Sequence, residues 1–109
     1  MLSSKYLKIL VIGDIGVGKT QFLSKLSQSP KINTSTIGID IYYYKKYILW
    51  EIPSNINNKK IINQLFKDGD YVFIIWDGYL YPHKWIRLAN EHHIDHILLT
   101  VTDNFPFSY

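Results

Sequence analysis

The order of apolar and polar positions predicts a chain in which strands and helices alternate. Continuous apolar runs are typical of strands buried on both faces, and apolar residues three and four apart are typical of helices that cover a sheet. The expected strands are 7–12, 39–44, 47–52, 71–76 and 97–101, and the expected helices are 18–27, 59–66 and 82–92. This alternation predicts a mostly parallel sheet covered on both faces, with 39–44 and 47–52 as an antiparallel hairpin.

Composition narrows the class of protein. The 109 residues are expected to form one domain, 1–109, and a hydrophobic fraction of 47% is typical of globular proteins. The net charge is +3 with the lysines dispersed singly and in pairs, which argues against nucleic-acid binding. The chain has no cysteine, hence no disulfide and no acceptor for prenylation or palmitoylation. With no signal peptide and no apolar run of about 20 residues, we expect a cytoplasmic protein without a direct membrane anchor.

One stretch has the spacing of a phosphate-binding loop, and it follows the first expected strand directly. It fits the pattern G-x-x-x-x-G-K-[ST] with Gly13, Asp14, Ile15, Gly16, Val17, Gly18, Lys19 and Thr20. In such a loop, glycines let backbone N–H groups turn toward phosphate oxygens, the lysine reaches the β- and γ-phosphates, and the hydroxyl is placed to bind Mg²⁺. A strand before the loop and a helix after it make an accidental glycine-rich turn the weaker interpretation.

Together these features resemble the Ras-like small GTPases, nearest the Rab branch. The resemblance rests on Asp14 and Val17 inside the loop, on Thr-Ile-Gly-Ile-Asp at residues 36–40, and on Trp50 at a strand end. It covers nearly the whole chain from Leu7, strongly in the first forty residues and weakly after them. It implies the P-loop NTPase fold, a three-layer α/β/α domain with a mostly parallel five-stranded sheet and one antiparallel hairpin strand.

The resemblance also implies a ligand. A small GTPase binds GTP or GDP with Mg²⁺, which would make residues 13–20 the phosphate site and the hydroxyls of Thr20 and Thr36 the metal ligands. Asp103, in Thr100-Val101-Thr102-Asp103, matches the aspartate that reads guanine, although the family's asparagine and lysine are missing. There are simpler interpretations of both residues: Thr36 merely begins a strand, and Asp103 merely ends one. A further alternative is that the site binds ATP instead of GTP.

The element after the second hairpin strand departs from the family pattern. Where the family has Asp-x-x-Gly-Gln, this chain reads Glu51-Ile52-Pro53-Ser54-Asn55. Glu51 is one methylene longer than the family's aspartate, so its carboxylate must withdraw or coordinate differently, and we expect weaker metal binding. Asn55 is shorter than the glutamine that orients water, so we assign no catalytic residue and expect weak or absent hydrolysis. An alternative is a pseudo-GTPase that occupies the partners of true GTPases.

Partner surfaces are expected in two places. The family meets its effectors between Thr36 and Ile52, a region that carries an aromatic group here: Tyr42, Tyr43, Tyr44 and Tyr47. Compared with the family, the chain lacks the last strand and helix, which makes 97–101 an apolar sheet edge. An edge of this kind predicts pairing with a partner or a second copy, or else marginal stability. Alternatively, Phe105, Phe107 and Tyr109 fold back over the gap.

Overall fold

A computed structural model describes residues 6–27, 32–33 and 38–108. The elements are β1 (Leu7–Ile12), α1 (Lys19–Leu26), β2 (Ile32–Asn33), β3 (Asp40–Tyr44), β4 (Tyr47–Glu51), α2 (Lys59–Asp68), β5 (Tyr71–Ile75), α3 (His83–Glu91) and β6 (His96–Leu99). All the predicted strands and helices are present, with boundaries shifted by one or two residues. At Thr100 and Val101 the chain forms a turn, so the last strand ends two residues earlier than predicted.

The strands form one sheet in the order β2-β3-β4-β1-β5-β6. β1 lies at the centre, parallel to β4 and to β5, and β5 is parallel to β6. β3 pairs antiparallel with β4, as the predicted hairpin requires. The two-residue strand β2, antiparallel to β3, was not predicted, so the sheet has six strands instead of five. The predicted mostly parallel α/β/α class is confirmed.

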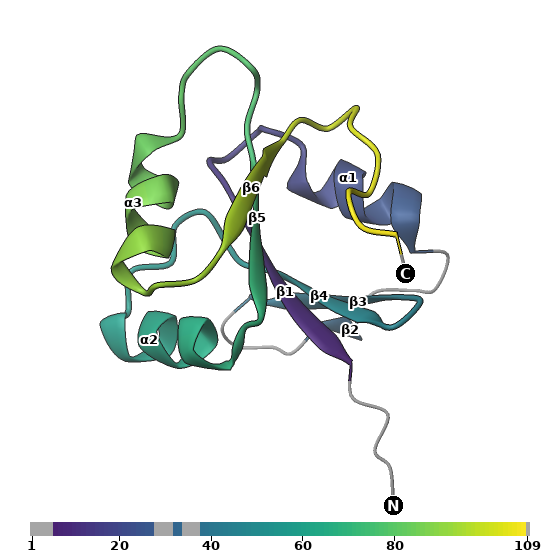
Figure 1. Cartoon of the computed structure of the whole chain (residues 1–109). Coiled ribbons are helices and arrows are strands. Elements are labelled where there is room, and N and C mark those ends of the chain that lie inside the picture. The colour runs from purple at the N-terminus through teal and green to yellow at the C-terminus, as the bar shows by residue number, and fades with distance from the viewer. Residues whose placement is uncertain (1–5, 28–31, 34–37, 109) are drawn as a thin grey trace, which may run out of the picture.

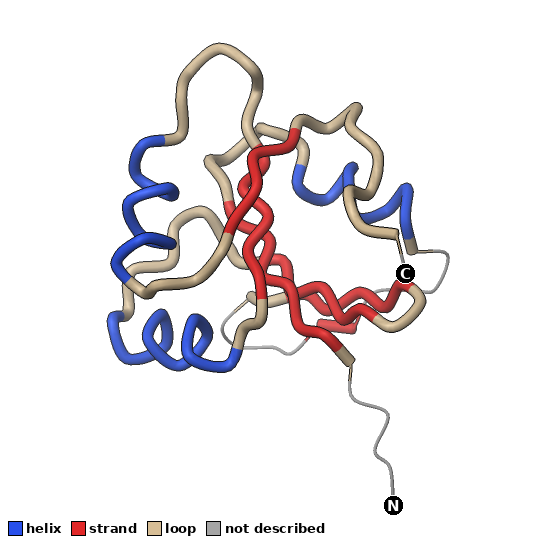
Figure 2. The backbone as a smooth tube through the Cα atoms, viewed as in Figure 1, coloured by secondary structure: helices blue, strands red, loops and turns tan. Residues whose placement is uncertain are grey.

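Helices cover both faces of the sheet (Figures 1 and 2). On one face, Phe22 and Leu23 of α1 pack with Val11, Leu49 and Phe73 of the strands. On the other face, α2 and α3 contribute a cluster centred on apolar residues of β1 and β5. The central strands are buried on both sides because their side chains alternate between these two cores. This arrangement fixes the carboxyl end of β1, where the phosphate loop begins.

The segment after β6 folds back over the face that α1 covers only in part (Figure 1). The ring centres of Phe105 and Phe107 each lie 5.6 Å from that of Phe73. Phe105 also contacts Tyr44 and Tyr47, at 4.9 Å each. The predicted fold-back is confirmed for these two rings, while Tyr109 lies outside the described residues. The predicted edge position of the last strand is also confirmed, since β6 ends the sheet order.

Candidate functional site

The predicted phosphate loop connects the carboxyl end of β1 with the first turn of α1. Its backbone requires glycine at two positions. Gly13 has φ +154°, and a Cβ there would lie 2.3 Å from the Ile75 carbonyl oxygen. Gly18 has φ +101°, and a Cβ there would lie 2.9 Å from the Val101 side chain. Glycine is therefore required at both positions, because the loop packs closely against β5 and the segment after β6.

Lys19 is held inside the loop by main-chain carbonyls. Its Nζ donates to the carbonyl of Gly13 at 2.8 Å and to that of Asp14 at 3.1 Å, and the residue is 8% exposed. Burial lowers the pKa of the Lys19 ammonium, and the negative charges of Glu51 and Asp14 partly offset that effect. The loop thus keeps a positive charge at the start of α1, an end of a helix that itself favours anions.

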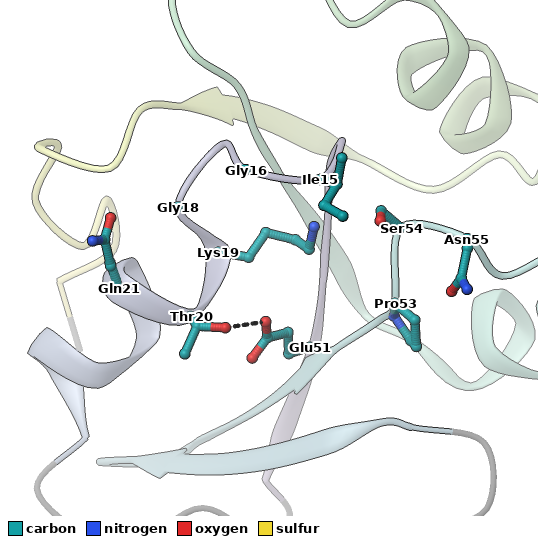
Figure 3. Close-up of a pocket in the computed structure, with 10 residues that line it drawn as sticks. All are labelled: Ile15, Gly16, Gly18, Lys19, Thr20, Gln21, Glu51, Pro53, Ser54 and Asn55. Atoms are coloured by element: carbon teal, nitrogen blue, oxygen red, sulfur yellow. Dashed lines mark hydrogen bonds between the residues drawn. The ribbon is translucent and has the colours of Figure 1, made fainter.

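A pocket of about 560 Å³ lies between the loop and a second segment, which consists of the end of β4 and the residues just after it. Its walls are formed by Ile15, Gly16, Gly18, Lys19, Thr20 and Gln21 on the loop side, and by Glu51, Pro53, Ser54 and Asn55 on the other side (Figure 3). The first wall carries the cation and the hydroxyl, and the second carries a carboxylate and an amide. The pocket is large enough for the phosphate groups of a nucleotide.

Thr20 and Glu51 connect the two walls. The Thr20 hydroxyl donates to Glu51 Oε2 at 2.5 Å (Figure 3), and the Tyr42 hydroxyl donates to Glu51 Oε1 at 3.2 Å. Burial raises the pKa of Tyr42, and the nearby Glu51 carboxylate raises it further, so Tyr42 remains a donor. Of the two outcomes expected for the Glu51 carboxylate, withdrawal from the site is not observed. The carboxylate instead contacts the hydroxyl of Thr20, the predicted metal ligand.

The residues at this point fit a magnesium ion. Mg²⁺ prefers oxygen ligands, and protein sites commonly supply only one or two of them, the rest coming from phosphate and water. Thr20 and Glu51 offer a hydroxyl and a carboxylate side by side. Within residues 6–27, 32–33 and 38–108, no group of three or more His, Cys, Asp or Glu residues gathers around one point. Thr36, the second predicted ligand, lies outside the described residues.

A contact that the sequence did not reveal holds the loop from behind. The indole Nε1 of Trp85, in α3, donates to Asp14 Oδ1 at 2.8 Å. Trp85 is 1% exposed, and it stands 71 residues along the chain from Asp14. The helix that carries it was predicted at 82–92, but no sequence signal identified the polar partner of Trp85. The bond fixes the side chain of a loop residue whose carbonyl accepts from Lys19.

Three other predicted site residues do not line the main pocket. Asp14 and Val17 turn away from the main pocket and line a smaller cavity beside Ile75. Asp103 lies in the turn after β6, where its Oδ2 accepts from the Thr100 N–H at 2.7 Å. That exposed carboxylate therefore closes its own turn and does not line the phosphate pocket. Its assignment to guanine stays a prediction.

Comparisons with known proteins show the fold. No protein-family model matches the chain, and neither does any curated protein sequence. Among solved structures, it is similar to the cytosolic domain of the T. maritima FeoB iron transporter in a GDP form, with 22% identity and a TM-score of 0.60. The match covers 85% of this chain and 44% of that one, so the chain spans less than half of its length. At this identity the likeness concerns the fold alone, the α/β/α arrangement of the P-loop NTPase class. None of the helices in the described ranges is long and apolar enough to cross a membrane.

Proposed function

We propose that this protein binds GTP or GDP together with Mg²⁺ in the pocket between residues 13–20 and 51–55, and that it hydrolyses GTP weakly or not at all. The observation that carries the proposal is the Lys19 ammonium, held within the loop by two carbonyls and bordering a pocket of about 560 Å³. A phosphate oxygen is a stronger partner for this cation than a neutral carbonyl, because its hydrogen bond carries charge on both sides.

Guanine as the base is supported by two further features. The FeoB cytosolic domain, similar in fold, is described in a GDP form. Asp103 is present at the position that reads guanine in the resembling family, and Val101, two residues before it, lies close to Gly18 of the loop. For this carboxylate to read a base, it must exchange its bond to the Thr100 N–H. The Rab-like character and the cytoplasmic localisation belong to the same proposal.

Magnesium would be held by the hydroxyls of Thr20 and Thr36, with the Glu51 carboxylate close beside Thr20. When bound, the ion neutralises part of the charge on the phosphates. Lys19 binds the same phosphates from the loop side. Tyr42 keeps Glu51 oriented through the second carboxylate oxygen.

Weak hydrolysis follows from the wall opposite the loop. Ser54 stands where the family has a glycine whose N–H approaches the γ-phosphate, and Pro53 restricts the backbone just before it. Asn55 is exposed at the pocket border, with a side chain too short to orient water as a glutamine does. Some GTPases speed hydrolysis with an arginine of their own that stabilises charge on the phosphates. Arg87 does not take this role here, because it lies in α3 and does not line the pocket.

A second candidate function is a pseudo-GTPase that acts through protein partners alone. The observation that favours it is that the two key side chains already have partners within the protein: Lys19 on loop carbonyls and Thr20 on Glu51. A ligand must replace both sets of bonds, which reduces its net binding free energy. In that case, the surface between Thr36 and Ile52 and the β6 edge are the proposed contact regions.

Titration calorimetry with Mg²⁺ and GTP, GDP or ATP distinguishes these functions. We expect micromolar binding of guanine nucleotides that disappears in Lys19→Ala and persists in Lys67→Ala, an exposed helix lysine away from the pocket. Equal binding of ATP would assign the site to a nucleotide of either base. Absence of all binding by a folded wild-type protein would favour the pseudo-GTPase.

A further inference from the structure

A second surface, beside the phosphate loop, carries exposed apolar side chains. Tyr79, Leu80 and Tyr81, here called the Tyr-Leu protrusion, are 89%, 75% and 52% exposed. They belong to the segment between β5 and α3, which projects from the body of the molecule at the top of Figure 1. Ile15 of the phosphate loop is 86% exposed and lines a cavity together with Leu80. Exposed apolar groups gathered in one place are typical of interaction sites.

Several bonds give the protrusion a defined shape. Asp77 Oδ1 accepts from the N–H of Tyr79 at 2.8 Å and from that of Leu80 at 3.0 Å. These two donors lower the pKa of Asp77, so its carboxylate stays charged. The Tyr81 ring packs edge-on against Trp76, with 5.9 Å between centres. Because these bonds already order the protrusion, it would lose little conformational entropy of its own when a partner binds.

Between the protrusion and the phosphate loop lies a cavity of about 140 Å³. Apolar residues, among them Ile15, Val17, Leu80 and Pro82, line it together with Trp76 and with polar groups. One water occupies about 30 Å³ in the liquid, so the cavity has room for one long side chain. The walls would accommodate an apolar chain of methylene groups.

Two residues with carboxylate side chains are among those that line this cavity. Asp14 and Asp77 both line it, one from each side. Each uses Oδ1 in a bond within the protein, to Trp85 and to the protrusion respectively. No described residue donates a hydrogen bond to either Oδ2. The cavity therefore combines an apolar wall with two acceptors of one sign of charge.

We propose that this surface binds a partner protein that inserts an arginine or lysine side chain into the cavity and lays an apolar residue on Leu80. Long basic side chains combine an apolar stem with a cationic end, which matches the walls and the carboxylates. Trp76 adds an aromatic face that attracts a cation. An anionic membrane is the poorer occupant, because Asp14 and Asp77 would repel it. The proposal does not depend on nucleotide binding.

Nuclear magnetic resonance with short peptides tests the chemistry directly. The probes are acetyl-Leu-Arg-Leu-amide and the same peptide with citrulline, a neutral isostere, in place of arginine. We expect the arginine peptide to shift the amide signals of Asp14, Ile15, Asp77 and Leu80, with a Kd of about 1 mM. The citrulline peptide should bind at least about fivefold more weakly, because it lacks the charge. Equal binding of both peptides, or shifts confined to other residues, would overturn the proposal.

Two variants and a control locate the site. Leu80→Ser removes the apolar contact, and Asp77→Asn removes the charge while keeping the oxygen that caps the protrusion. Both should weaken the arginine peptide about fivefold or more. Tyr6→Ser removes an exposed aromatic residue just before β1 and should leave binding unchanged. Sedimentation with phosphatidylserine-containing vesicles that Leu80→Ser abolishes would assign the surface to a membrane. Dimerisation abolished by that same variant would assign it to a second copy, and either result overturns the proposal.

Discussion

The two walls of the phosphate pocket are fixed by different kinds of contact. On the loop side, Gly13 lies against the backbone of β5, Gly18 against Val101, and Asp14 against Trp85 of α3. On the opposite side, buried Ile52 anchors the chain, while Pro53 and Ser54 are half-buried and Asn55 is exposed. The loop wall is part of the packing of the fold. In the opposite wall, Pro53, Ser54 and Asn55 are not fully buried, and all three line the pocket.

This difference separates evidence for the fold from evidence for the function. The fold would require glycine at positions 13 and 18 even if no nucleotide ever bound, since a Cβ would collide there. The evidence for phosphate binding lies instead in Lys19 and Thr20, whose polar ends face the pocket. Evidence for or against turnover lies in residues 51–55. Substitutions of Gly13 and Gly18 should therefore affect stability, whereas substitutions of Lys19, Thr20 and residues 51–55 should affect ligand binding or turnover.

The largest effect is expected for Gly13→Ala. The new Cβ would lie 2.3 Å from a carbonyl oxygen of β5, and the backbone has positive φ, so the loop must shift. We expect the free energy of unfolding to fall by about 3 kcal/mol. Gly78→Ala is the matched control, with φ +86° and open space around it, and should cost about 1 kcal/mol. Urea denaturation measures both, and equal losses would contradict a packed loop wall.

The next effect concerns the helix behind the loop. Trp85→Phe removes the donor to Asp14 and leaves space in a buried site, so we expect a loss of about 2 kcal/mol in unfolding free energy. Trp50→Phe serves as the control, because the buried Nε1 of Trp50 has no hydrogen-bond partner among the described residues. It should cost less than half as much. If the two variants were equally stable, the Trp85 bond would not support the loop.

Glu51→Gln is expected to act on the ligand and not on the fold. Without Mg²⁺, the Glu51 carboxylate beside Thr20 repels phosphate, so the variant should bind GTP about fivefold more tightly in EDTA. With Mg²⁺, the same variant should bind about fivefold more weakly, because a charged partner of the ion is lost. Calorimetry in the two buffers, with Glu91→Gln as a control on α3, checks the reversal. A change in the same direction in both buffers would contradict this role of Glu51.

The smallest effect is a pH dependence caused by Lys19. Burial lowers its pKa in the folded state below the ordinary 10.5, so the unfolded chain holds this proton more tightly. The free energy of unfolding should therefore gain a rising contribution as pH increases toward 10.5. Lys19→Met should lack this contribution, and Lys67→Met should retain it. Urea denaturation at a series of alkaline pH values measures the difference, and identical slopes for wild type and Lys19→Met would contradict it.

Much of the fold could be predicted because local patterns determine it. Apolar runs marked β1 and β5, and the loop motif marked the junction of β1 with α1. The two-residue strand β2 could not be predicted, because its existence depends on pairing with β3 and on no apolar run of its own. The end of β6 was missed because Thr100 and Val101 are good strand formers that enter a turn instead.

The candidate site could be predicted only where residues are neighbours in sequence. The loop motif located Lys19 and Thr20, and the family pattern located Glu51, but the bond between Thr20 and Glu51 joins positions 31 residues apart. The Trp85 bond to Asp14 is hidden for the same reason. Nothing in the local sequence indicated that an oxygen of Asp77 shapes the Tyr-Leu protrusion. Such contacts depend on tertiary packing, which no local spacing records.

The aromatic segment that folds back over the sheet has a consequence for biosynthesis. Phe105 and Phe107 cover Tyr47 and Phe73, but they follow all six strands in the chain. During translation, this aromatic face therefore stays exposed until residues 105–107 have left the ribosome. Partly synthesised chains that expose such surface are substrates for chaperones and prone to aggregate. A released chain truncated after Asn104 should bind chaperones more strongly than the chain that carries both phenylalanines.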